Sequence, residues 1–226
     1  MFQGFSQQAV DFLWGIRFNN ERPWFEAHKQ EYQDLIAAPI KELARQTQAA
    51  MLERYPKLQL EVKVSRIYRD ARRLHGRGPY KDHMWFVLRR PKDCGIGPTP
   101  CFYFEIAPEY HSMGMGYYSA TPLTMAKFRA RVDRNPAELE KLARELNRRD
   151  DFRLEGEQYA RSKGDVGELL ALWYNRKNIS ITWDRNCEGS LFGPELAREI
   201  AEGFDFLMPY FLYFDSLDGD PVPGEG

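Results

Sequence analysis

The spacing of apolar residues along this chain changes from a helical period to a strand period and back, and this change limits the fold more than any other feature. Over residues 6–18 the apolar side chains recur three or four positions apart, which predicts an amphipathic helix. A second stripe begins near Trp24 and runs to about Tyr55, with Pro39 expected to break or kink it. Asn20 lies just before this stripe, where its side chain is expected to cap a helix N-terminus.

The middle of the chain has the period of a β-strand instead. Leu60, Val62 and Val64 alternate with polar residues, which is the pattern of a half-buried strand. Further apolar or alternating segments follow over residues 84–90, 101–106 and 111–118. Because short connections join these consecutive segments, we expect them to form an antiparallel meander.

Helical spacing returns after Thr121. Two helices are predicted over residues 122–134 and 136–148, since Asn135 and Pro136 form a typical helix start. The remaining predicted elements are a weak strand over 152–158, a helix over 165–176, a strand over 179–183 and a last helix that begins at Gly193-Pro194.

This order of elements predicts the α+β fold class, with N-terminal helices, a central antiparallel meander sheet and C-terminal helices packed on one face of the sheet. No linker separates two cores, so residues 1–215 are expected to form a single domain. Residues 216–226 are rich in Gly, Pro and acidic side chains and have no apolar period, which predicts a disordered tail.

Charge is distributed unevenly along the chain. The 32 Lys and Arg residues nearly balance the 33 Asp and Glu residues, and the formal net charge of −1 excludes a generally cationic nucleic-acid coat protein. Residues 61–93 nevertheless carry a net charge of +6, and residues 188–226 carry −8. A basic segment of this kind attracts anions even when the whole chain is nearly neutral.

The rest of the composition excludes further classes of protein. The N-terminus lacks the basic and apolar regions of a signal peptide, and no run of about 18 apolar residues is available to span a membrane. Cys94, Cys101 and Cys187 are too few for a secreted disulfide scaffold and lack zinc-ligand spacing. We therefore expect a cytoplasmic protein without a metal or a cofactor, whose oligomeric state stays open.

The basic segment contains the best candidate for a functional site. Arg66, Arg69 and Arg72 recur just after Val64. If the strand persists through them, Arg66 and Arg72 share one face and Arg69 lies on the other. Arginine is the favoured side chain for bidentate contact with phosphate or carboxylate groups. Asp70 lies between these arginines, where it is placed to hold a guanidinium in one orientation.

Two further features extend this candidate site. The Gly76–Pro79 loop is expected to return Lys81 toward the arginines, and exposed loop backbone adds N–H donors. Glu105 lies in an otherwise apolar strand, either as a perturbed acid or arginine partner or on a solvent-facing side of that strand. The candidate ligand-binding residues are Arg66, Arg69, Asp70, Arg72, Arg77, Tyr80, Lys81 and Glu105. Solvated charges on a strand edge would have a similar composition, and that interpretation stays open.

Several segments together resemble one protein family. They are Phe2-x-Gly4-Phe5 with Phe12-Leu13, Asn19-Asn20 with Trp24-Phe25, Arg66-Ile67-Tyr68-Arg69-Asp70-x-Arg72 with Pro79-Tyr80-Lys81, and Gly114-Met115-Gly116. Over residues 2–215 the chain is similar to a widespread family of uncharacterised bacterial and fungal proteins, catalogued as a domain of unknown function. The resemblance implies a single α+β domain, a soluble intracellular protein and no particular activity. The family usually has an aromatic residue after Arg72, and Arg73 is therefore the weakest candidate.

Three hypotheses about function follow. The first is a module that binds, or acts on, a small phosphorylated or other anionic ligand through the basic cluster, with no catalytic residue assigned. The second is a nucleic-acid-associated protein whose cluster contacts backbone phosphates while Tyr68, Tyr80 and Trp85 stack on bases, which the near-neutral charge makes less favoured. The third is a protein–protein interaction module whose acidic segment, residues 188–226, meets a basic partner.

Overall fold

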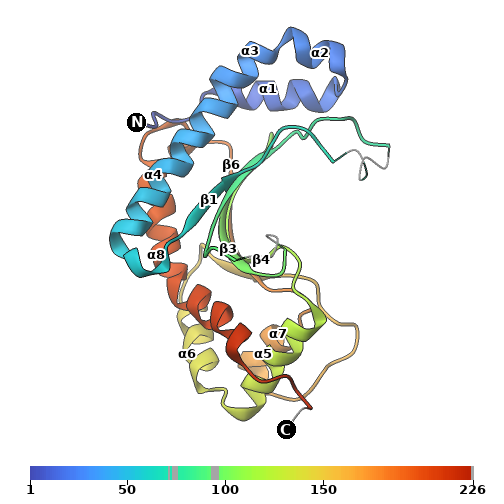
Figure 1. Cartoon of the computed structure of the whole chain (residues 1–226), viewed down its shortest axis with the longest axis vertical. Helices are drawn as coiled ribbons and strands as arrows, with labels where there is room; N and C mark the ends of the chain where they lie inside the picture. Colours follow the sequence, from blue (N-terminus) through green and yellow to red (C-terminus); the bar gives the residue numbers. More distant parts are fainter. Residues whose placement is uncertain (71, 73–75, 93–96, 225–226) are drawn as a thin grey trace. The chain divides into compact units, whose positions relative to one another are not determined.

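The computed structural model describes residues 1–226 except 71, 73–75, 93–96 and 225–226. It has the predicted α+β class, with N-terminal helices, a six-stranded antiparallel sheet and C-terminal helices (Figure 1). Within the described residues, no helix combines the length and the apolar character needed to cross a membrane.

The chain divides into two compact units, and each is assembled from three segments. Unit 1 contains Met1–Arg90, Tyr103–Met113 and Asp184–Gly203, and unit 2 contains Pro91–Phe102, Gly114–Trp183 and Phe204–Gly226. The chain passes repeatedly between them, so neither unit is a separate stretch of sequence. The expectation of one domain over residues 1–215 stays a prediction.

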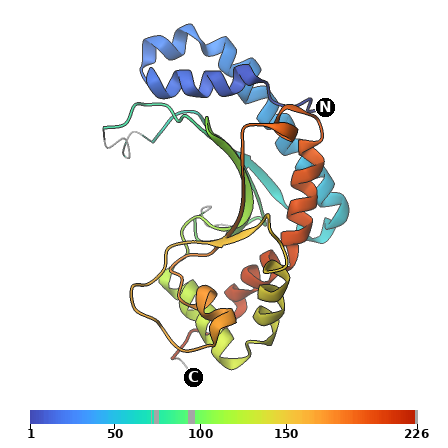
Figure 2. The same cartoon turned by 180° about the vertical axis from the view of Figure 1, so that it is seen from behind.

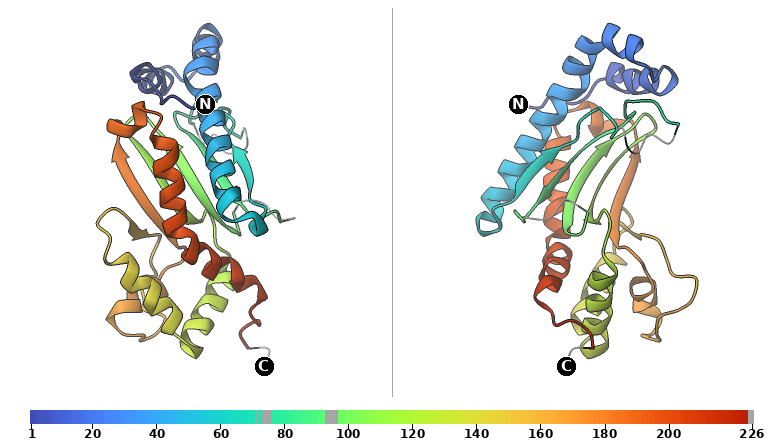
Figure 3. Two further views of the ribbon diagram at one scale, coloured as in Figure 1. Left: turned by 90° about the vertical axis from the view of Figure 1, so that its left-hand side faces the viewer. Right: turned by 45° about the vertical axis from the view of Figure 1, so that its right-hand side comes forward.

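The first helices all belong to unit 1. They are α1 (Gln7–Phe18), α2 (Arg22–Ala27), α3 (Lys29–Glu31), the π-helical turn η1 (Tyr32–Ala37), α4 (Ala38–Arg54) and the 3-10 turn η2 (Pro56–Leu58). Ser6 caps α1 by accepting a hydrogen bond from the Ala9 N–H at 3.2 Å. Pro39 lies in the first turn of α4, where its missing N–H costs little, and η1 leads directly into α4. Figure 3 shows α4 alongside β1.

The sheet confirms the predicted meander. Its strands are β1 (Glu61–Val64), β2 (Met84–Arg89), β3 (Pro100–Ile106), β4 (Tyr110–Tyr117), β5 (Arg153–Glu155) and β6 (Ser180–Asn186). Their order is β1-β2-β3-β4-β6-β5, so the first four strands neighbour one another in chain order. In the first pair Val64 lies opposite Phe86. On the side of unit 1 that faces its helices, the buried rings of Phe5 and Phe86 both stack on Phe104, with centroids 6.3 and 5.6 Å away.

Unit 2 packs its helices around the second half of the last helix. Its helices are α5 (Pro122–Arg134), α6 (Ala137–Leu146), α7 (Glu168–Tyr174) and the C-terminal part of α8 (Leu196–Asp215), which follows the 3-10 turn η4 (Gly189–Phe192). Phe214 of α8 contacts the ring of Phe128 at 5.6 Å and that of Trp173 at 6.3 Å. The Tyr210 hydroxyl donates to the carbonyl oxygen of Leu142 at 2.9 Å. Figure 2 shows these helices gathered together.

The expectation of a disordered tail from residue 216 does not hold for residues 216–220. Ser216–Gly219 forms the 3-10 turn η5, and Leu217 is only 1 % exposed. Arg131 donates to the two carboxylate oxygens of Asp220, from Nε at 2.7 Å and from Nη2 at 2.8 Å. The segment is held in place by two isolated residues, the buried Leu217 and the ion-paired Asp220. Two isolated residues produce no apolar period, so the composition alone indicated disorder.

Asp220→Asn is expected to lower the free energy of unfolding by about 1 kcal/mol at pH 7, because it removes one charge of this ion pair. The bonds from Arg131 hold the pKa of Asp220 below its ordinary value, although partial burial opposes this shift. The stabilisation is therefore complete above about pH 4 and disappears as the pH falls through the depressed folded-state pKa.

Urea unfolding at pH 7 and at pH 2 tests this expectation. The difference between wild type and Asp220→Asn should shrink at pH 2, whereas exposed Asp150 provides a control whose change to Asn has little effect at either pH. An equal loss at both pH values would contradict the role given to the ion pair.

Candidate anion-binding site

The segment that holds most of the predicted site residues is a second antiparallel hairpin beyond β1 and β2. The expected strand stops at Val64, but backbone pairing resumes as a bridge between Tyr68 and Tyr80. The Arg69 N–H donates to the carbonyl of Pro79, and the Lys81 N–H donates to that of Ile67, both at 2.7 Å. Lys81 is thus returned to the arginine strand, as the Gly76–Pro79 loop predicted.

Asn20 anchors this hairpin to the N-terminal helices. Its side-chain amide donates to the Tyr80 carbonyl, and its Oδ1 accepts from the Tyr80 N–H, both at 2.9 Å. The expectation that Asn20 caps the next helix is wrong, since α2 begins after Glu21, which makes no side-chain cap bond. Tyr80 itself is 2 % exposed and stacks on Phe25 with ring centroids 4.1 Å apart. Its ring therefore belongs to the core and offers no surface to a ligand.

Arg69 points into an ion-pair network rather than onto an open surface. Its side chain is 17 % exposed, and it donates to the Tyr80 carbonyl at 2.7 Å and to Asp82 at 3.3 Å. Asp82 also accepts from Nε of Arg17 at 2.6 Å and contacts Nδ1 of His83 at 3.1 Å. Burial opposes ionisation of Asp82, but these bonds outweigh it and lower its pKa. Arg69 thus stabilises the hairpin by joining its two strands through the Tyr80 carbonyl and Asp82.

Asp70 and Arg72 form a separate, local pair. Arg72 donates to Asp70 from its backbone N–H and from its guanidinium at 2.8–3.0 Å, which confirms that Asp70 lies within hydrogen-bond reach of an arginine. The Arg72 side chain is nevertheless 88 % exposed. Arg77 is exposed in the loop, and Arg73 lies outside the described residues. The predicted cluster is therefore divided: Asp70, Arg72 and Arg77 do not form one binding site with Lys81.

Lys81 is the predicted residue that three others, Arg69, Arg66 and Glu105, act on. The Lys81 ammonium donates to the carbonyl of Arg66 and lies 5.6 Å from the centre of the Trp85 ring. Burial lowers the pKa of Lys81, the charges of Arg69 and Arg66 lower it further, and Glu105 acts in the opposite direction. Lys81 is therefore a half-buried cation among like charges, balanced by one carboxylate.

Tyr110 extends this surface and was missed by the sequence-based reasoning. Its hydroxyl donates to Glu105 at 2.7 Å. Burial raises the pKa of Tyr110, and the Glu105 carboxylate raises it further, so the phenol stays protonated at neutral pH. The turn between β3 and β4 places Tyr110 beside Glu105, since Ala107 N–H donates to the Tyr110 carbonyl at 2.8 Å. The tight turn at Pro108 was the available signal.

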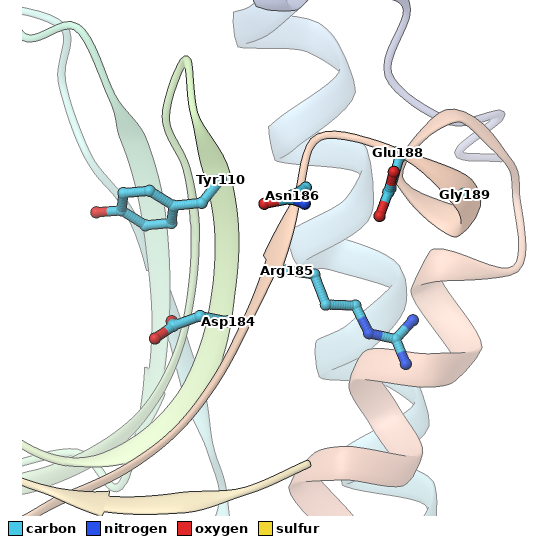
Figure 4. A pocket seen from close by; sticks show the side chains of 6 residues that line it. All are labelled: Tyr110, Asp184, Arg185, Asn186, Glu188 and Gly189. Carbon is cyan, nitrogen blue, oxygen red and sulfur yellow. The ribbon is translucent and has the colours of Figure 1, made fainter.

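A cavity of about 620 Å³ adjoins Tyr110 in unit 1. It is lined by Tyr110, Asp184, Arg185, Asn186, Glu188 and Gly189. Figure 4 shows that Tyr110 and Asp184 point to the same side of the sheet, whereas Arg185 points to the other side, toward α8. There Arg185 lies 3.8 Å from Glu199. The described residues contain no group of three His, Cys, Asp or Glu arranged to hold a metal ion.

Comparison with known proteins confirms the resemblance drawn from the motifs. The sequence profile of one family, described as "Conserved hypothetical protein (DUF2461)", matches residues 8–213. The search of the curated proteins found no match. Because the profile covers most of the chain and the structure has the α+β order that the motifs implied, this protein belongs to the DUF2461 family of conserved hypothetical proteins.

Proposed function

We propose that this protein binds a small phosphorylated or other anionic ligand on the surface formed by Arg66, Lys81 and Trp85. The observation that carries the proposal is the environment of Lys81. Its ammonium is half-buried beside the charges of Arg69 and Arg66, and within the described part of the chain no carboxylate forms an ion pair with it. Like charges held together raise the electrostatic free energy, and a bound anion would offset this cost.

The three side chains have complementary capacities for such a ligand. Lys81 uses one of its three N–H donors in the hydrogen bond to the Arg66 carbonyl, so the other two can donate to an anion. Arg66 is exposed and supplies a planar guanidinium suited to bidentate contact with phosphate or carboxylate. The Trp85 ring, whose centre lies 5.6 Å from the ammonium nitrogen, supplies an apolar surface for the ligand to contact. The Arg69–Asp82–Arg17 network holds the backbone of this surface in place.

Lys81→Gln is expected to abolish stabilisation of the protein by inorganic phosphate. In the wild type, phosphate at 100 times its dissociation constant should stabilise the fold by about 2.7 kcal/mol, which a thermal-shift titration detects. Lys41→Gln, at an exposed position on α4, is the matched control and should retain the shift. The pKa of Lys81 lies below that of an ordinary lysine. As the pH rises, Lys81 should therefore lose its proton, and the protein its affinity for phosphate, at a lower pH than if the site used an exposed lysine. A phosphate shift that survives in Lys81→Gln would refute the proposal.

Ionic strength separates this proposal from nucleic-acid binding. Contacts with several backbone phosphates would make the logarithm of the affinity fall with that of the salt concentration, by roughly 0.7 to 0.9 per contact. A partly desolvated site for one small anion should respond much less. Fluorescence anisotropy with a labelled single-stranded oligonucleotide, at 50 and 200 mM salt, measures this difference, and a steep slope would favour the nucleic-acid reading.

The acidic C-terminal segment gives less support to a protein partner. Asp215 and Asp218 both pair with Lys92, at 2.8 and 2.6 Å, and Asp220 pairs with Arg131. Carboxylates engaged within the fold are less available to a basic partner. The proposal also includes a cytoplasmic location, which the sparse cysteines favour.

A further inference from the structure

We infer that the ligand of the Arg66–Lys81 surface is a hydroxylated anion of the sugar-phosphate class, with its hydroxyl groups bound by Tyr110, Asp184 and Asn186. This inference rests on the proposed function, because it takes the anionic group to lie at Lys81. It adds the chemistry of the rest of the ligand, which the neighbouring cavity specifies.

The two ends of this proposed site are linked by a series of side chains on one face of the neighbouring strands β2, β3, β4 and β6. Trp85, beside Lys81, precedes Phe86, and Glu105 follows Phe104; because both phenylalanine rings pack on the helix side and side chains alternate along a strand, Trp85 and Glu105 lie on the opposite face. Glu105 acts electrostatically on Lys81 at one end and accepts the Tyr110 hydroxyl at 2.7 Å at the other. The charge of Asp184 acts in turn on Tyr110, and both residues line the same cavity. Figure 4 shows their side chains on the same side of the sheet. These side chains therefore offer a ligand one face of the sheet, from Lys81 beside Trp85 toward Asp184.

The lining of the cavity selects the chemistry of the ligand. Its volume of about 620 Å³ lies within the usual range for small-molecule sites. Apart from Gly189 every lining side chain is polar, and the ring of Tyr110 is the one large apolar surface among them. Carboxylate and amide oxygens accept hydrogen bonds, so they favour a ligand that carries donors such as hydroxyl groups.

The charges along the series also set the direction of the ligand. An anionic group near Asp184 would be repelled by that carboxylate, whereas Lys81 and Arg66 attract one, so the anionic group belongs at the Lys81 end. Arg185 does not reverse this preference, because it points away from Asp184 and toward Glu199. A neutral, hydroxylated body attached to one anionic group satisfies both ends, with the Tyr110 ring available to contact its C–H faces.

Calorimetric titration with three probes tests this inference: inorganic phosphate, glucose 6-phosphate and phosphoethanolamine. We expect glucose 6-phosphate to bind about tenfold more tightly than phosphate, since hydrogen bonds to a charged acceptor contribute at least that much. Asp184→Asn should weaken glucose 6-phosphate about tenfold and leave phosphate unchanged, whereas Lys81→Gln should weaken both. Glu202→Gln, an exposed carboxylate change on α8, is the control and should affect neither.

The outcomes distinguish this inference from the proposed function. If glucose 6-phosphate binds no more tightly than phosphate, or if Asp184→Asn leaves its affinity unchanged, the inference is overturned while Lys81-dependent phosphate binding still supports the proposed function. If phosphoethanolamine binds more tightly than glucose 6-phosphate, the oxygens of Asp184 and Asn186 bind an ammonium group and not hydroxyl groups. That result would also overturn the inference. Phosphate binding that is insensitive to Lys81→Gln would overturn both.

Discussion

Gly78→Ala is expected to lower the free energy of unfolding by about 3 kcal/mol or more. A Cβ atom at Gly78 would lie 2.2 Å from Oδ1 and 2.4 Å from the backbone oxygen of Asn20. The Asn20 side chain would have to move, and both of its hydrogen bonds with the Tyr80 backbone would be lost. The contact with the backbone oxygen would remain even then. The position requires glycine because two backbone segments approach closely there.

Gly76→Ala is the matched control in the same loop. Gly76 has φ +80°, but no atom of the described residues lies within 4 Å of its added Cβ. Its replacement should cost only about 1 kcal/mol from backbone strain. Urea unfolding of both variants measures the difference, and equal losses would show that the approach to Asn20 is not the cause. Because Tyr80 precedes Lys81, Gly78→Ala should also weaken phosphate binding.

Arg69→Gln is expected to lower the free energy of unfolding by about 2 kcal/mol. The Arg69 guanidinium is mostly buried and satisfies both the Tyr80 carbonyl and a share of the Asp82 charge. Removing one member of a buried ionic network leaves its partners insufficiently paired, and the cost is that of the uncompensated groups. Arg17 still bonds to Asp82, which keeps the loss below that of an isolated buried pair.

Arg72→Gln provides the comparison, and it should cost less than about 0.5 kcal/mol. The Arg72 side chain is almost fully exposed and, among the residues that the structure describes, pairs with the nearby Asp70, and such pairs contribute little in water. Chemical unfolding of the two variants at equal ionic strength separates their roles. Loss of stability in Arg72→Gln with none in Arg69→Gln would contradict the division of the predicted cluster.

Elements with a strong local period could be predicted closely from the sequence. The helix over residues 122–134 has those bounds in the structure, where Thr121 caps it and accepts from the Thr124 N–H at 3.0 Å. The four-stranded meander was also predicted, since short connections allow few alternatives to antiparallel pairing. These features depend on residues that lie near one another along the chain.

The candidate site shows a mixed outcome for a physical reason. The return of Lys81 toward the arginine strand followed from the Gly76–Pro79 loop, which is a local signal. The different environments of Arg69 and Arg72 could not be predicted from a local signal. Two residues of the same type differ only in the groups that the folded chain places next to them. Arg69 meets Asp82 and the Tyr80 carbonyl, whereas Arg72 faces solvent.

By itself, the sequence determined the family, the α+β class, the order of the main elements and the basic hairpin, because period, turns and charge are local properties. Only the tertiary structure decided that Asn20 holds Tyr80, that Arg69 braces Asp82, and that Tyr110 joins Glu105. The pairs Asn20–Tyr80 and Arg17–Asp82 join positions more than 50 residues apart. Such pairing depends on how helices and strands pack, since burial makes a polar group find a partner wherever the fold supplies one.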